Sequence, residues 1–269
     1  MRAMKMIDQR DQQDARPSAR SRAPVLWPWV LVIAAWTAVL LATLTKQTSL
    51  INHNYLLTQS HLSWFVALVV FLVSWQVMTV AMMLPSSMPL ISVIVHASRR
   101  RRYPWVMQAT FLVGYACVWT VFAFAAFLLD TLVHWLVSNW FWLYMHSWLI
   151  GAVIFAIAGG FQFLPLKERC VKQCRSPLSF FTRYYRQGVD PGWHLGLRHG
   201  IFSLGSCWAL MFGIGQGIIV WMAVLTGLIV VEKTYPGGQL LSPLLGAALL
   251  LLAVLWMIHP VWLLAGSGV

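Results

Sequence analysis

The stretch that decides the fold is Leu62–Val95, which reads LSWFVALVVFLVSWQVMTVAMMLPSSMPLISVIV and contains no charged side chain. As one straight helix it would be about 51 Å long, whereas the hydrocarbon core of a bilayer is about 30 Å thick. A proline inside a helix removes a backbone hydrogen bond and bends the chain. The stretch therefore predicts an over-long membrane helix that is kinked at Pro85–Pro89.

The rest of the chain has the same apolar character. Of its 269 residues, 59% are hydrophobic and 10% are charged, against about 25% charged residues in an ordinary soluble domain. This composition excludes a soluble enzyme, a disordered chain and a disulfide-rich secreted domain. A spanning helix needs about 20 mostly apolar residues. The segments that can supply one are Trp27–Leu44, Leu62–Val95, Trp105–Leu129, Ser147–Leu164, Ile201–Val231 and Leu241–Ile258. The predicted fold is all-α, a polytopic bundle of about six transmembrane helices.

The cationic residues predict the orientation of this bundle. With six spans, all of the 19 Lys and Arg residues except Lys46 and Lys233 fall on the same side as the N-terminus. Because Lys and Arg concentrate in cytoplasmic loops, we expect a multi-pass protein of the cell inner (plasma) membrane with both termini in the cytoplasm. This arrangement places Glu232 near the outer face and Lys167 on the inner side.

A second over-long segment, Ile201–Val231, leaves the number of spans open. It contains Gly213, Gly215 and Gly217, and glycines in a membrane helix either allow a neighbouring helix to approach closely or mark a break. A break would divide the segment into two short spans and give seven in total.

The net charge of +12 has two interpretations. A basic protein can bind nucleic acid, but Arg99–Arg102 lies between two predicted spans and suits anionic lipid head groups. The predicted partner is therefore the lipid bilayer and not nucleic acid. Residues 1–24 are polar, basic and too poor in apolar side chains to order themselves. We expect them to form a disordered cytoplasmic tail, and 25–269 to form a single transmembrane helical domain.

Sulfur-bearing side chains are the strongest candidates for a functional site. The predicted metal ligands are Met78, Met82, Met83, Cys170, Cys174, Cys207 and Met211. Both Cys170/Cys174 and Cys207/Met211 are four residues apart, which brings the members of each pair to one side of a helix. Thiolate and thioether groups suit Cu(I), whereas structural zinc needs four ligands, so copper is favoured and zinc is the alternative. In the competing interpretation the methionines fill gaps in the core and the cysteines bind no metal.

Three motifs, taken together and in their order along the chain, resemble those of a known family. They are Trp75-x-x-Met78 followed by Ala81-Met82-Met83-Leu84-Pro85, then Gln162-x-x-Pro165-x-Lys167-x-x-Cys170-x-x-x-Cys174-Arg175-x-Pro177, then Gly205-x-Cys207-Trp208-x-Leu210-Met211 with Glu232-Lys233. The chain resembles a bacterial family of predicted metal-binding integral membrane proteins of unknown function, and the resemblance implies a metal site in the bundle. The chain departs from the family pattern at Ser203 and Ser206, where more cysteine is usual, and at Gln216-Gly217-Ile218, where a Met-Asn pair is common.

Three classes of function remain open at this point. The first is a non-enzymatic membrane protein that holds or delivers a soft metal such as copper. The second is a structural membrane subunit that anchors a partner protein through the basic 165–199 loop. The third is a membrane permease or enzyme. The chain has no Gly-x-x-x-x-Gly-Lys-Ser/Thr, His-Glu-x-x-His or Gly-x-Ser-x-Gly motif, and no carboxylate near the centre of a span. This favours the first class and predicts no catalytic residue.

Overall fold

The computed structural model describes residues 23–45, 64–98, 103–146, 148–185, 191–212, 219–235 and 237–258. Within these ranges the secondary structure is helical, without strands, which confirms the predicted all-α class. The helices are α2 (Ala23–Leu44), α4 (Trp64–Ser98), α5 (Pro104–Asn139), α6 (Phe141–Met145), α7 (Trp148–Phe161), α8 (Pro165–Arg175), α9 (Pro177–Tyr184), α10 (Pro191–Phe212), α11 (Ile219–Thr234), the 3-10 turn η3 (Gly238–Leu240) and α12 (Leu241–Ile258). The predicted tail lies outside the described residues except for its last two, which begin α2.

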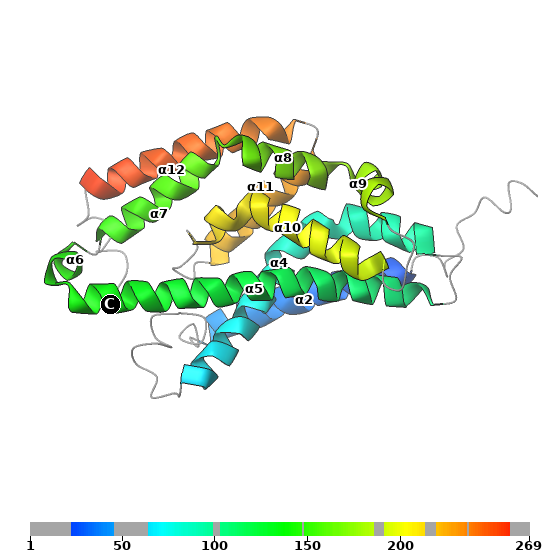
Figure 1. Ribbon diagram of the computed structural model, residues 1–269, viewed down its shortest axis with the longest axis horizontal. Coiled ribbons are helices and arrows are strands. Elements are labelled where there is room, and N and C mark those ends of the chain that lie inside the picture. The colour runs from blue at the N-terminus through cyan, green and yellow to red at the C-terminus, as the bar shows by residue number, and fades with distance from the viewer. Residues whose placement is uncertain are drawn as a thin grey trace, which may run out of the picture.

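Helix α4 lies in the middle of the bundle and packs against α2, α5 and α11 (Figure 1). It continues through both prolines as one helix, and Figure 1 shows it changing direction along its course. Because Pro85 has no N–H, the carbonyl of Ala81 one turn earlier loses its helical partner. The indole N–H of Trp36 on α2 donates to that carbonyl over 3.0 Å. The helix therefore passes the proline without a break because α2 replaces the missing hydrogen bond.

Glycines allow α10 to lie directly against the backbone of α5. A Cβ atom at Gly192 would lie 2.5 Å from the carbonyl oxygen of Met107, and a Cβ atom at Gly196 would collide with that of Phe111. The contacts advance in the same direction along both helices, so α5 and α10 run parallel and begin at the same end of the molecule. Helix α2 also begins there, since Trp27 donates a hydrogen bond to Gln108.

Helices α7 and α12 form an antiparallel pair. A Cβ atom at Gly151 would lie 3.1 Å from Nε1 of Trp256, and one at Gly159 would lie 3.0 Å from the carbonyl oxygen of Gly246. Helix α12 consequently ends where α7 begins, near the end of α5 and opposite to the start of α2 (Figure 1). Helix α2 thus begins and α12 ends at opposite ends of the molecule, whereas the two termini, which were predicted to share the cytoplasmic side, lie outside the described residues.

The second over-long segment is divided into two helices, α10 and α11, and residues 213–218 between them lie outside the described ranges. The Nζ of Lys167 on α8 lies 2.7 Å from Oε1 of Glu232 near the end of α11. The prediction that these two residues lie on opposite sides of a membrane is therefore wrong. A single span over 201–231 would separate them, whereas a pair of helices returns the chain to α8.

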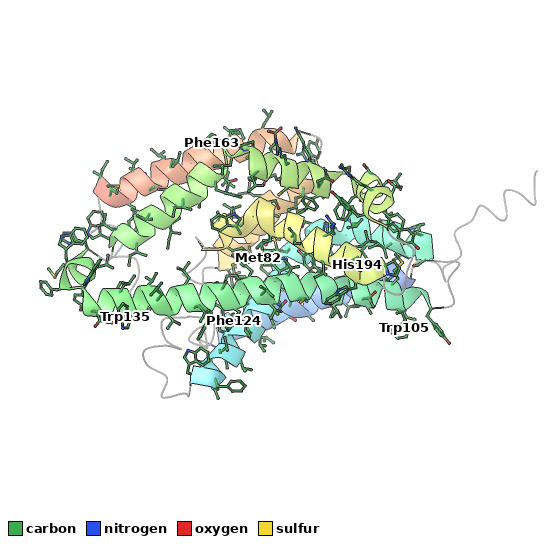
Figure 2. All side chains as sticks on the ribbon, in the orientation of Figure 1. Met82, Trp105, Phe124, Trp135, Phe163 and His194 are labelled. Atoms are coloured by element: carbon green, nitrogen blue, oxygen red, sulfur yellow. The ribbon has the colours of Figure 1, made fainter. Side chains whose placement is uncertain are left out.

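Four described helices are long and apolar enough to cross a membrane, and α7 with α8, bent by 62°, would make a fifth. They are Leu26–Leu44, Trp64–Ser98, Trp105–Asn139 and Leu241–Ile258. Figure 2 shows Met82 inside the bundle and Trp105, Phe124 and Trp135 along the outer side of α5. These three side chains are 63%, 42% and 60% exposed, so the outer surface of the bundle is itself apolar.

Candidate sulfur site

One pair of the predicted ligands joins α4 to α10. The Sγ of Cys207 lies 3.4 Å from the Sδ of Met83, two residues that are 124 positions apart in the chain. Met82 and Met83 are fully buried, and Cys207 and Met211 are 2% and 3% exposed. Met78 is half-buried and packs against the same core. The structure thus brings sulfur atoms from the first and third sequence motifs into direct contact.

Local chemistry fixes the backbone around Met83. The hydroxyl of Ser86 donates to the carbonyl of Met83 over 2.8 Å, and that of Ser87 lies 3.4 Å from the same oxygen. Both hydroxyls therefore bind the backbone of their own helix, one turn before their positions. On α10, the thiol of Cys207 also lies 2.9 Å from the carbonyl oxygen of Ser203. The sulfur atoms are consequently held on two rigid helices.

Helix α8 brings the second motif to the same region. Its buried side carries Lys167, Cys170, Val171 and Cys174. A Cβ atom at Gly205 would lie 2.7 Å from Sγ of Cys170, so the absence of a side chain at Gly205 makes room for this thiol two residues from Cys207. All four cysteines are free thiols. Burial raises the pKa of Cys174 to about 11, which keeps its thiol protonated at neutral pH.

The opposite side of α8 is exposed and charged. Lys172 and Glu168 form an ion pair of 2.6 Å, one helical turn apart, with both side chains more than half exposed. The hydrogen bond from Lys172 lowers the pKa of Glu168. Helix α8 is therefore amphipathic, with thiols on the side that faces the bundle and charges on the side that faces away.

A buried polar network surrounds the thiols of α8, and sequence reasoning did not predict it. Lys167 pairs with Glu232 and also donates to the side-chain oxygen of Gln162. Ser242 on α12 donates to the carboxylate of Glu232, and Arg175 donates to its main-chain carbonyl over 2.7 and 2.9 Å. The signal in the sequence was the position of these charges inside two of the three motifs.

Histidine and carboxylate ligands do not gather in this region. Within the described residues, no group of three or more His, Cys, Asp or Glu side chains could hold a metal ion. His199 is buried, and its Nε2 lies 3.0 Å from Oγ of Ser87. A site with three or more ligands between α4 and α10 would therefore need donors of another type, such as methionine thioethers.

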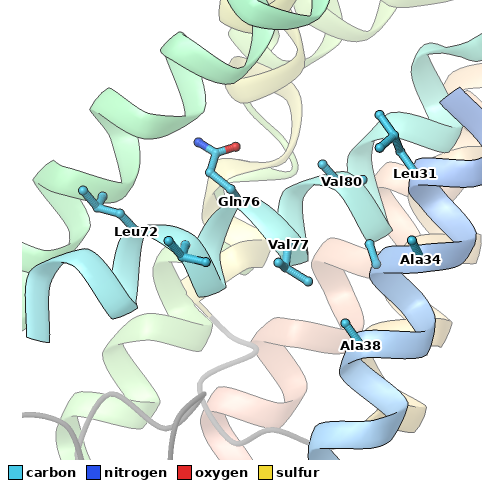
Figure 3. A pocket seen from close by; sticks show the side chains of 9 residues that line it. Leu31, Ala34, Ala38, Leu72, Gln76, Val77 and Val80 are labelled. Atoms are coloured by element: carbon cyan, nitrogen blue, oxygen red, sulfur yellow. The ribbon is translucent and has the colours of Figure 1, made fainter. Parts of the chain in front are cut away.

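An open groove between α2 and α4 has a volume of about 480 Å³ (Figure 3). Its lining is aliphatic except for Gln76. The amide of Gln76 donates to the hydroxyl of Thr120 over 2.6 Å and to the carbonyl of Ala116 over 3.1 Å. None of the seven predicted ligands lines this groove, so it is separate from the sulfur site.

The fold and the site together define an apolar helical bundle with thiol and thioether groups buried at its centre. Residues 72–256 match the model of the PpoB2 family, which is described as copper chaperone, and the chain belongs to this family. The matched range contains all seven predicted ligands and the polar network of α8. Comparisons with curated proteins and with solved structures give no match.

Proposed function

We propose that this chain binds Cu(I) as a cargo between α4 and α10, with Met83 and Cys207 as ligands and a thiol of α8 as the third. The observation that carries the proposal is the buried contact of 3.4 Å between the sulfur atoms of Met83 and Cys207 in a member of a copper-chaperone family. Copper enters here as the ion that is held and passed on. The proposed role is non-enzymatic.

The chemistry of the donor set supports copper over harder ions. Thiolate and thioether sulfurs are soft ligands that select Cu(I), whereas carboxylate, carbonyl and water oxygens suit Mg²⁺, Ca²⁺ or Mn²⁺. The only described carboxylate at the site, Glu232, is paired with Lys167. Met82, Met211 and Met78 lie in the same core and provide further thioethers along the path of the ion.

We also propose that α2, α4, α5, α7 and α12 cross the cell inner membrane, and that α10 and α11 enter from the cytoplasmic side and return to it. The four long apolar helices and the antiparallel α7–α12 pair support this arrangement. It moves Lys233 to the cytoplasmic side and leaves Lys46 as the only cationic residue outside, in better agreement with the preference of Lys and Arg for cytoplasmic loops. Helix α12 then ends at the outer face.

A chaperone must hand its ion to an acceptor, and we propose that the basic 165–199 segment is the surface that the acceptor protein contacts. The amphipathic α8 supports this role, because its thiols lie directly beneath its exposed charged side. An acceptor that binds the exposed side would be within one helix diameter of the ion.

The proposal is tested by loading detergent-purified protein with Cu(I) under reducing conditions and measuring copper per chain. The wild type is expected to bind close to one equivalent, and Cys207→Ser and Met83→Leu are expected to lose most of it. Cys117→Ser is the matched control for the first variant, because Cys117 is half-buried on α5. Met88→Leu is the control for the second, because Met88 is buried on α4 in a separate apolar cluster. No bound copper in the wild type would contradict the proposal.

A further inference from the structure

Lys233 is a buried cation that forms no ion pair with a carboxylate among the described residues. Its side chain is 4% exposed, and its Nζ donates to the hydroxyl of Ser203 over 3.0 Å. The adjacent carboxylate of Glu232 is within electrostatic range, but it forms its ion pair with Lys167 and accepts a hydrogen bond from Ser242. An ammonium with a single neutral hydroxyl as its hydrogen-bond partner is costly to bury.

The position of Lys233 ties its charge to the sulfur site. Ser203, which accepts its hydrogen bond, is fully buried and lies one helical turn before Cys207, whose thiol contacts the carbonyl of Ser203 at 2.9 Å. The hydrogen bond to Ser203 places the ammonium on the same helical turn of α10 as the thiol of Cys207. The phenol of Tyr115 lies 3.1 Å from the same Ser203 hydroxyl, and the carboxylate of Glu232 is paired with Lys167. The thiol of Cys207 is therefore the group on this turn that gains a negative charge when a metal displaces its proton.

Copper binding changes the charge of this region in a defined way. When Cu⁺ replaces the protons of two thiols, both protons leave, copper stays Cu(I), and the metal with its two thiolates carries a net charge of −1. Together with the ammonium the site is then neutral, which is the arrangement that a low-dielectric interior favours. Zn²⁺ on the same two thiolates is already neutral, so the ammonium would remain unbalanced.

Resting on the proposed function, we propose that Lys233 is the counter-cation of a bis-thiolate Cu(I) site formed by Cys207 and a thiol of α8, and that it determines the preference for a monovalent over a divalent soft ion. The thioether of Met83 completes the ligand set without adding charge. Lys233 touches no metal in this arrangement and acts through the charge that it balances.

The test compares wild type, Lys233→Met and Lys233→Arg by competition with a chromophoric chelator, for Cu(I) and for Zn(II), in anaerobic detergent solution. Removing the charge is expected to lower the Cu(I) affinity about tenfold or more, as loss of a supporting residue does in other metal sites, and to leave the Zn(II) affinity unchanged or higher. Lys233→Arg keeps the charge and is expected to retain most of the Cu(I) affinity. Lys172→Met, which removes an exposed lysine from α8, is the control.

Lys233→Met with wild-type Cu(I) affinity, or with equal losses for both metals, would overturn the inference. If the variant does not fold, a measurement on the wild type alone still tests the bis-thiolate site. Binding of one Cu⁺ near pH 7 is expected to release two protons, and release of one would contradict the bis-thiolate site. A wild type that binds no Cu(I) contradicts the proposed function itself, whereas normal binding that ignores Lys233 contradicts only this inference.

Discussion

The two helices that contribute sulfur from the first and second motifs, α4 and α8, differ in the charge of their surroundings. On α4, Met82 and Met83 are fully buried neutral side chains within an apolar core. On α8, Cys170 and Cys174 lie beside buried charges, and the outer side of the same helix is exposed and ionised. A thioether binds a metal without losing a proton, whereas each thiol must release one. For the proposed Cu(I) site we therefore expect the thioethers of α4 to contribute mainly to affinity, and the thiols of α8 to make binding and exchange depend on proton release.

The largest expected effect concerns the ion pair that fastens α8 to the bundle. Lys167→Met leaves Glu232 buried without a counter-charge, and breaking a buried pair in this way costs about 3–5 kcal/mol. We expect a lower denaturation midpoint in detergent, measured by circular dichroism. The double variant Lys167→Met/Glu232→Gln should recover part of the loss. Lys172→Met breaks only the exposed pair of α8 and should leave the midpoint unchanged; an equal loss in both single variants would contradict the distinction between the two sides of α8.

The second prediction separates the affinity for Cu(I) from the rate at which Cu(I) is transferred. Met83→Leu should weaken Cu(I) binding by about 10- to 100-fold, the range typical of groups that support a metal site. Cys170→Ser should instead slow transfer of Cu(I) to a soluble thiol acceptor and change the affinity less. Chelator competition gives the affinity, and stopped-flow transfer gives the rate. If Met83→Leu altered only the rate and Cys170→Ser only the affinity, the assignment of roles to α4 and α8 would be reversed.

The third prediction concerns the helix contact that positions Cys207. Gly196→Ala places a methyl group against the carbonyl of Phe111, and overpacking of this kind costs about 1–3 kcal/mol. Because α10 must move away from α5, we expect a lower denaturation midpoint together with a lower Cu(I) affinity. Gly160→Ala, where nothing lies within 4 Å of the added atom, is the matched control. Equal midpoints for the two variants would show that the close contact does not constrain α10.

The smallest expected effect tests how α4 passes Pro85. Trp36→Phe removes the indole N–H that donates to the free carbonyl of Ala81, and an unpaired carbonyl of this kind costs about 1–3 kcal/mol. Trp29→Phe, at a position that is 44% exposed, is the control. We expect a lower denaturation midpoint for Trp36→Phe than for Trp29→Phe, and the reverse order would contradict the role given to Trp36.

Sequence reasoning predicted the helical class and the four long apolar helices, because runs of uncharged residues identify such helices directly. It also selected Met83 and Cys207, whose sulfur atoms are in contact. It failed where the side assigned to a residue depends on whether the number of spans before it is odd or even. The sequence left open whether 201–231 is one span or two, and the six-span arrangement placed Glu232 opposite Lys167, although the two are paired. Hydropathy gives the length of an apolar run and does not give the point at which the chain turns back within it.

The most direct test of the central claim is X-ray absorption at the copper edge of the Cu(I)-loaded protein and of its Met83→Leu and Cys207→Ser variants. We expect the first coordination shell of the wild type to consist of sulfur, and each variant to lose one sulfur scatterer or fail to load. A shell of nitrogen or oxygen, or a sulfur shell that both variants leave unchanged, would show that copper does not bind between α4 and α10.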